Sequence, residues 1–384
     1  MFARPFRRAD EGDRRMDGTV YGANVAERSV AATERAAATK RLVTVSVVQF
    51  FASVCILARH YSFFLEKDFP AVTAALSGIT FTDYFFCCSG FFMHYVNARK
   101  PDMTVGPLVK KRFIKLYPLH LATTLFYVAI LIASAHLSSL GGTRSGWECV
   151  LPTITLTHAF GTVDQQCLNY PSWFLSALFA LTLAYPAIRW TINKFGAASV
   201  LTLTVLIVVA YEAAYRFGDA PHWSSLTYNF GILRGIPTFL AGILIAEYLP
   251  RIAPHIKSFT LGYAAFGAAL IGMMTGLDPL ICYGILPVAL VALLAGAEAN
   301  GARSVLRNRR LAAVGGWSFP LYLLHVPIAA VLLNFAAVRF LHLHGWVLVG
   351  AALATAAVAI IASWIASHVL DSWTPAPATR RKPA

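Results

Sequence analysis

Long apolar segments separated by short polar ones dominate the chain from residue 42 onward. Each segment has about 17–25 residues, the length that a helix needs to cross roughly 30 Å of hydrocarbon. They lie at residues 42–64, 76–96, 116–137, 172–191, 197–215, 229–248, 258–275, 279–297, 312–334 and 345–369. The pattern predicts an all-α integral membrane protein with about ten transmembrane helices.

Two parts of the chain depart from this pattern. Residues 147–160 are shorter and more polar, with Pro152 and several threonines, and are predicted to be re-entrant or interfacial. Residues 1–39 are polar and lack an apolar periodic face, and apolar sequence begins only near Leu42, too late for a signal peptide. We therefore expect a disordered cytosolic tail (1–39), a polytopic membrane domain (40–370) and a short basic cytosolic tail (371–384).

The distribution of charge predicts the orientation. Of the 384 residues, 57% are hydrophobic and 13% charged, and the net charge is +14, whereas soluble domains carry about 25% charged residues. Most of the 32 Lys and Arg residues fall in the two tails and in alternate loops. This is the positive-inside pattern, so both termini are predicted to be cytoplasmic. Topology then explains the positive charge, and the expected partner is the lipid bilayer, with no nucleic acid.

Ionisable residues inside membrane helices are costly and are candidates for function. His60 ends the first apolar run, toward the outer half of the bilayer. It is either an interfacial histidine in contact with water or a general base, since its ordinary pKa lies near the working pH. Asp83, in the second helix, needs a partner, and Arg59 and His60 on the adjoining helix are the candidates. Ser89-Gly90 favours close packing of another helix.

A basic stretch enters the third helix from the predicted cytosolic side. Arg112 and Lys115 are three residues apart and share a helical face. They either hold the phosphates of a cytosolic donor such as coenzyme A or act as snorkelling anchors.

Two later segments also carry candidate groups. Arg234 lies within a helix close to Pro237, where backbone groups can be freed. His325 lies between two prolines, and Tyr322 is three residues before it on the same face. Packing is the expected role of Tyr322, while the role of His325 stays open.

The six cysteines show no spacing typical of a metal site, and no metal is expected. Cys149 and Cys167 fall in a loop predicted to lie outside. There they either form a disulfide, since such a compartment is oxidising, or remain two free or buried thiols.

Six elements in order resemble the membrane acyltransferase 3 family, bacterial enzymes that O-acylate glycans and other envelope molecules. The similarity covers about residues 42–364. The elements are His60 at the end of the first helix, the Asp-x-Phe-Phe-x-x-Ser-Gly-Phe run at 83–91, the basic Tyr-Pro element at 112–118, Trp173 to Ser176 with Pro186, the segment from Arg234 to Gly242, and the segment from Ser318 to Pro327. Three positions differ from the family pattern: Gln49 and Lys115 stand where arginines are usual, and Leu178 where glutamate is frequent.

The resemblance implies a membrane-embedded O-acyltransferase of the cell inner membrane. It would move an acyl group, most simply acetyl, from cytosolic acyl-CoA to a hydroxyl of a glycan or lipid-linked saccharide. A thioester is already activated, so no metal or tightly bound cofactor is expected. The implied general base is His60, oriented by Asp83. Arg112, Lys115 and Tyr117 are implied in donor binding, and Trp173, Arg234, Ser318, Tyr322 and His325 in substrate binding.

The alternative from another functional class is a secondary transporter or flippase for a glycan or lipid. Such a protein shares the many helices, the Pro- and Gly-interrupted segments and the buried charges. It would often show related halves, which this sequence does not display.

Overall fold

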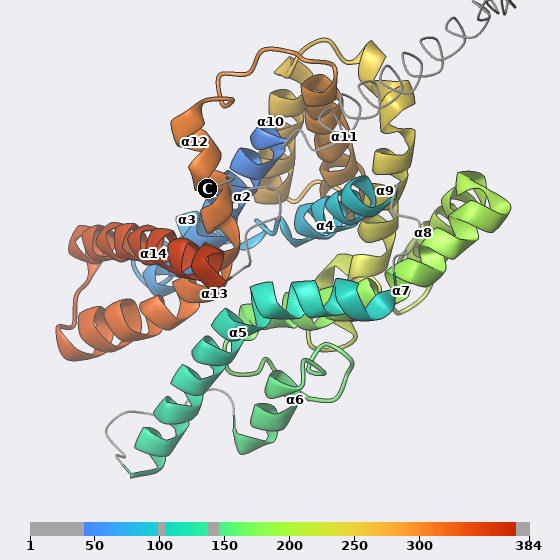
Figure 1. Ribbon diagram of the computed structural model, residues 1–384. Helices are drawn as coiled ribbons and strands as arrows, with labels where there is room; N and C mark the ends of the chain where they lie inside the picture. Colours follow the sequence, from blue (N-terminus) through green and yellow to red (C-terminus); the bar gives the residue numbers. More distant parts are fainter. Residues whose placement is uncertain (1–41, 99–103, 137–145, 374–384) are drawn as a thin grey trace, which may run out of the picture. The chain divides into compact units, whose positions relative to one another are not determined.

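The computed structural model describes residues 42–98, 104–136 and 146–373, and the regular structure in these ranges is helical, without strands (Figure 1). The α-helices are α2 (Val43–Ser62), α3 (Pro70–Ser77), α4 (Thr82–Asn97), α5 (Val105–His136), α6 (Val150–Ile154), α7 (Trp173–Phe195), α8 (Ala197–Phe217), α9 (Gly231–Ile252), α10 (Thr260–Thr275), α11 (Leu286–Ala299), α12 (Arg309–Val314), α13 (Ser318–Ala329) and α14 (Gly345–Trp373). A π-helical segment, η7 (Leu280–Ile285), precedes α11, and another, η9 (Ala330–Phe340), follows α13. The all-helical prediction is confirmed.

Nine helical segments in the described ranges are long and apolar enough to cross a membrane. The remaining segment expected to span, residues 258–275, forms α10, which has only 16 residues. At 1.5 Å per residue this helix is about 24 Å long, shorter than the roughly 30 Å hydrocarbon core. The expected count of about ten therefore divides into nine full-length candidates and one short apolar helix.

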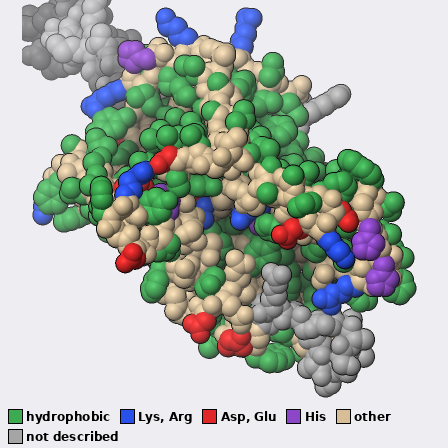
Figure 2. All heavy atoms as spheres, turned by 180° about the vertical axis from the view of Figure 1, so that it is seen from behind, with side chains coloured by type: hydrophobic (Ala, Val, Ile, Leu, Met, Phe, Trp, Pro, Cys, Tyr) green, Lys and Arg blue, Asp and Glu red, His purple; other side chains and the backbone are tan. Residues whose placement is uncertain are grey.

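Apolar side chains (green) are spread over the face of the molecule shown in Figure 2. The helices α8 and α14 are the most exposed of the nine candidates, with 11% and 22% of their most apolar stretch buried inside the protein. Residues such as Leu206 and Leu353 are more than half exposed. Such surfaces suit contact with lipid tails rather than water.

The second apolar segment differs from its prediction as one helix over 76–96. It is split into α3 and α4, with residues 78–81 between them outside any helix. Gly78 lies at this break, and only glycine fits there, because a Cβ would collide with the backbone of Met273 on α10. Irregular backbone at membrane depth is tolerated where it is buried in protein or lines a cavity, and Gly78 and Thr80 do line one.

Close contact between α4 and α9 organises the middle of the domain. A Cβ on Gly90 would collide with the backbone of Phe239, and one on Gly242 with the backbone of Cys87. Small residues at such positions let two membrane helices approach closely. The close packing expected at Ser89-Gly90 is therefore present, and it brings the N-terminal end of α4 beside α9.

Helix α5 begins at Val105, well before the predicted start at residue 116, and contains Pro118. Figure 1 shows α5 bent along its length, and a proline within a helix is an established cause of a kink. Segment 147–160 forms the short helix α6 and returns along α5. The Tyr117 hydroxyl donates to the Ile154 carbonyl (3.0 Å), and the His120 ring nitrogen Nε2 to the Thr153 carbonyl (2.9 Å). Along α5, Tyr117 and His120 lie about 28 Å and about 24 Å before its end at His136. The prediction that segment 147–160 is re-entrant or interfacial stays a prediction.

A disulfide and a pair of hydrogen bonds each join separate parts of the chain. A disulfide joins Cys149 to Cys167, which decides between the two alternatives left open by the sequence. Glu298 at the end of α11 accepts hydrogen bonds from the first backbone N–H groups of α2, those of Val43 (2.7 Å) and Thr44 (2.8 Å).

The predicted tail 1–39 lies outside the described residues. The predicted tail 371–384 begins inside α14, and its part after Trp373 also lies outside them.

Candidate active site

A cavity of about 1080 Å³ lies among the helices, reaching from the end of α2 to the loops before α7 and α9. The sites predicted at His60, Trp173, Arg234 and Tyr322 all line it. In Figure 2, basic side chains (blue) are visible in a recess near the middle of the face shown. The other aromatic, hydroxyl and amide groups of the lining belong to Phe63, Phe64, Ser77, Thr80, Thr82, Phe126, Tyr127, Gln166, Tyr170, Ser224, Ser225, Thr227, Tyr283, Asn334 and Phe335.

His60 and His325 form a directly bonded pair. Nδ1 of His60 is 2.7 Å from Nε2 of His325, and the ring planes are parallel within 2°. Nδ1 of His325 is 2.9 Å from the Leu321 carbonyl oxygen. His325 is 1% exposed, and the Tyr61 hydroxyl donates to its carbonyl (3.0 Å). His325, which the resemblance implied in substrate binding, lies outside the described lining of the cavity and instead holds the predicted base.

These contacts fix the tautomers of both rings when they are neutral. The Leu321 carbonyl can only accept, so Nδ1 of His325 carries the hydrogen and its Nε2 accepts. Nδ1 of His60 must then be the donor, and Nε2 of His60 keeps its lone pair. This is the form of imidazole that can remove a proton from a hydroxyl group.

Asp83 does not contact His60, so its predicted role of orienting that ring is not supported by the geometry. Its carboxylate oxygens accept hydrogen bonds from Nε (3.2 Å) and an Nη (2.6 Å) of Arg234, and both side chains are almost fully buried. The tight packing of α4 on α9 explains this choice of partner. Arg234 also donates to the Thr80 hydroxyl (2.7 Å) at the break between α3 and α4 and lies over the Trp173 ring at 5.4 Å.

The other predicted substrate residues divide into two groups. Trp173 and Tyr322 line the cavity, and the Tyr322 hydroxyl donates to the Pro171 carbonyl (2.7 Å). Ser318 lies outside the described lining. Its hydroxyl is 2.7 Å from the Ser53 hydroxyl and donates to the Gln49 carbonyl (3.1 Å), so it joins α13 to α2.

The three predicted donor residues lie on α5, away from the described lining of the cavity. Arg112 donates to the Thr182 hydroxyl on α7 (2.8 Å), and Lys115 is exposed. Tyr117 makes the contact with α6 described above. The structure therefore brings His60, Trp173, Arg234, Tyr322 and, behind them, Asp83 and His325 together, and leaves the basic end of α5 as a separate region.

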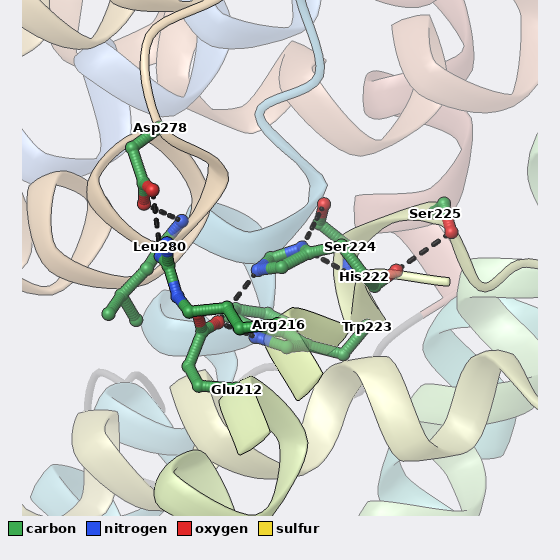
Figure 3. A network of polar contacts seen from close by, with 8 residues as sticks. All are labelled: Glu212, Arg216, His222, Trp223, Ser224, Ser225, Asp278 and Leu280. Atoms are coloured by element: carbon green, nitrogen blue, oxygen red, sulfur yellow. Dashed lines mark hydrogen bonds and ion pairs between the residues drawn. The ribbon is translucent and has the colours of Figure 1, made fainter. Parts of the chain in front are cut away.

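A polar network holds the loop before α9 at the edge of the cavity (Figure 3). Nε2 of His222 is 2.9 Å from Glu212, while its Nδ1 accepts from the Ser224 backbone N–H (3.1 Å) and lies 2.7 Å from the Ser224 hydroxyl. Arg216 joins Glu212 to Asp278. Burial lowers the pKa of His222, although the Glu212 carboxylate acts in the opposite direction. Ser224 and Ser225 are thereby fixed in the lining.

His158 performs a similar task in the disulfide-bonded loop. It is 1% exposed, its Nδ1 donates to the Pro152 carbonyl (3.2 Å), and its Nε2 is 3.1 Å from the Ser172 hydroxyl. Burial, with the nearby His120 ring, lowers the pKa of His158 to about 4. The loop is thus tied to the start of α7 by a neutral histidine.

We expect the stability of this region to fall as the pH is lowered. The folded-state pKa of His158 lies below its ordinary value of 6.5, so the unfolded chain binds the proton more tightly. Its contribution is complete above pH 6.5 and falls by roughly 2 kcal/mol between pH 7 and pH 5. In thermal unfolding of the purified protein, the Tm of His158→Gln should decrease less between pH 7 and pH 5 than that of the wild type. The same substitution at the exposed His255 should leave the wild-type decrease unchanged. Parallel pH profiles for wild type and His158→Gln would contradict this assignment.

Several site residues were not identified from the sequence. Tyr170 lines the cavity with its ring 5.1 Å from that of His60, and Asn169 donates to the Leu323 carbonyl (2.9 Å). Arg59 was considered only as a partner of Asp83, and Arg339, which also lines the cavity, was not singled out. Each of these residues lies at an end of an apolar segment or next to one, and this position is the only signal that the sequence offers for them. Among the described residues, no group of three or more His, Cys, Asp or Glu side chains could hold a metal ion.

Comparison with known proteins agrees with this geometry. The model of the acyltransferase 3 family, described as "Acyltransferase domain", matches residues 43–368. The chain is 26% identical over 361 residues to acyltransferase MdmB of Streptomyces mycarofaciens, covering 86% of this chain and 91% of that protein. No solved structure matches. The chain belongs to the acyltransferase 3 family and is an acyltransferase with multiple candidate membrane-spanning helices, which confirms the enzyme prediction over the transporter alternative.

Proposed function

We propose that the protein is an O-acyltransferase of the cell inner membrane that moves an acyl group, most simply acetyl, from cytosolic acyl-CoA to a hydroxyl of a glycan or lipid-linked saccharide. The observation that carries the proposal is the contact of His60 with His325, which leaves Nε2 as the basic nitrogen of a residue that lines a large cavity of aromatic and hydroxyl groups. Aromatic faces and hydrogen-bonding groups together suit a sugar ring.

The proposed reaction needs one base and an activated donor. Nε2 of His60 takes the proton of the acceptor hydroxyl as its oxygen attacks the thioester carbonyl carbon. The tetrahedral intermediate then collapses by cleavage of the C–S bond. The thiolate of coenzyme A leaves and receives the proton from His60, so the products are an ester and free coenzyme A. His325 keeps the His60 ring in the required tautomer through its contact with the Leu321 carbonyl.

The donor is proposed to bind at the basic end of α5, outside the described lining of the cavity. Arg112 and Lys115 would hold its phosphates at the cytosolic mouth, if α5 has the orientation that the charge distribution predicts. The disulfide-bonded loop, which contributes Gln166 and Leu168 to the cavity, would then face the oxidising outer side. The acyl group would cross the bilayer inside the helix bundle.

The test is direct. The purified full-length protein, reconstituted in liposomes, is given acetyl-CoA labelled in the acetyl group and an extract of envelope glycans. We expect free coenzyme A to form only when the extract is present, with label in an alkali-labile ester. Label in an alkali-stable amide would contradict O-acylation. If acetyl-CoA stays unchanged while a longer acyl-CoA is consumed, the transferred group is the longer acyl chain and not acetyl.

A further inference from the structure

The described lining of the cavity holds cationic side chains but no carboxylate. Its described lining includes Arg59, Arg234 and Arg339, and no aspartate or glutamate. Arg234 is neutralised by Asp83, which lies behind the lining. Arg59, in the same cavity, therefore has no carboxylate facing it from the described lining.

Arg59 is the residue of interest, because it directly precedes His60 on α2. Its Nε is buried and has no hydrogen-bond partner. Its guanidinium lies 5.8 Å from the centre of the Phe63 ring, and no carboxylate among the described residues is within ion-pair distance of it. A partly buried charge without a counter-ion is costly, and such a charge is stabilised when an anion binds beside it.

We propose that Arg59 binds an anionic group of the acceptor, a carboxylate or a phosphate, so that the acceptor is an acidic saccharide. This inference rests on the proposed function. Arginine suits the task because its planar fork donates two parallel hydrogen bonds to either group. Because Arg59 and His60 are consecutive residues that line one cavity, the bound anion places the reacting hydroxyl beside Nε2 of His60.

The experiment measures binding, so it does not depend on turnover. The purified full chain in detergent is titrated with methyl β-D-glucuronide, with glucose 1-phosphate, and with the neutral methyl β-D-glucoside, and the dissociation constants are taken from thermal-shift curves. We expect the wild type to bind at least one anionic sugar on the order of tenfold more tightly than the neutral one. The anion that binds more tightly tells whether the group is a carboxylate of the glycan or a phosphate, as in a lipid linker.

Two variants and one control make the result specific. Arg59→Gln should bind the anionic and the neutral sugar about equally. Arg59→Lys keeps the charge but cannot donate two parallel hydrogen bonds, so it should retain part of the preference for the anionic sugar. Arg251→Gln is the matched control, because Arg251 lies over the Tyr248 ring and outside the described lining, and it should keep the full preference.

Equal binding of neutral and anionic sugars to the wild type would overturn the proposal, as would an undiminished preference in Arg59→Gln. If that variant instead lowered kcat for neutral acceptors with the binding preference unchanged, Arg59 would act on the oxyanion of the intermediate, and the proposal would be wrong. Charge-selective binding without any acyl transfer would count against the proposed function alone.

Discussion

His60→Ala is expected to lower the rate of acyl transfer by about 10²- to 10⁴-fold, the usual contribution of a general base. The reason is that Nε2 of His60 is the basic nitrogen which the contact with His325 leaves available to the cavity. The KM for acetyl-CoA should change little, since the imidazole contributes to the transition state and not to donor binding. Initial rates of label transfer by the reconstituted protein measure both quantities.

Chemical rescue separates a base from a structural residue. Added imidazole can enter a cavity of about 1080 Å³ and should restore part of the activity of His60→Ala. It should not restore His325→Ala, because His325 is 1% exposed and lies outside the described lining. Full activity of unrescued His60→Ala would show that another group accepts the proton.

Asp83→Ala is expected to produce the largest loss of stability, about 3–5 kcal/mol, because it leaves Arg234 buried without its counter-charge. In the wild type this ion pair also holds Arg234 in place to donate to the Thr80 hydroxyl at the break between α3 and α4. The measurement is the Tm of the purified variant, or its yield of folded protein, by fluorescence-detected size exclusion.

A double variant tests the cause. Asp83→Ala combined with Arg234→Met removes both charges and should be more stable than Asp83→Ala alone, since no unpaired ion remains. If the two single losses simply add, the residues do not act as a pair.

The sequence predicted the helices better than their interruptions. Apolar length alone located the spans, because it reflects the thickness of the bilayer. At the break, residues 78–81, Gly78 meets the backbone of α10, a contact between segments about two hundred residues apart that no local pattern contains. Helix α10 has only 16 residues because it ends at Thr275, where Gly276 takes the left-handed conformation typical of a helix C-terminus.

The site was predicted as a set of residues but not as a set of pairs. Order and spacing identified His60, Asp83, Arg234 and His325, whereas the partner of each depends on how helices pack. Asp83 faces Arg234 and not Arg59, because glycines on α4 and α9 let these helices touch. His60 meets His325 across 265 residues of sequence, and only the structure shows that the second ring sets the tautomer of the first.

The most direct test of acyl transfer through the helix bundle uses sealed vesicles of known orientation containing the full-length protein. Labelled acetyl-CoA is supplied only on the face that carries the N-terminus, and a membrane-impermeant glycan acceptor only on the opposite face. We expect ester-linked label on the acceptor with wild-type protein and almost none with His60→Ala. Transfer only when donor and acceptor share one face would contradict a reaction that passes the acyl group through the helix bundle to His60.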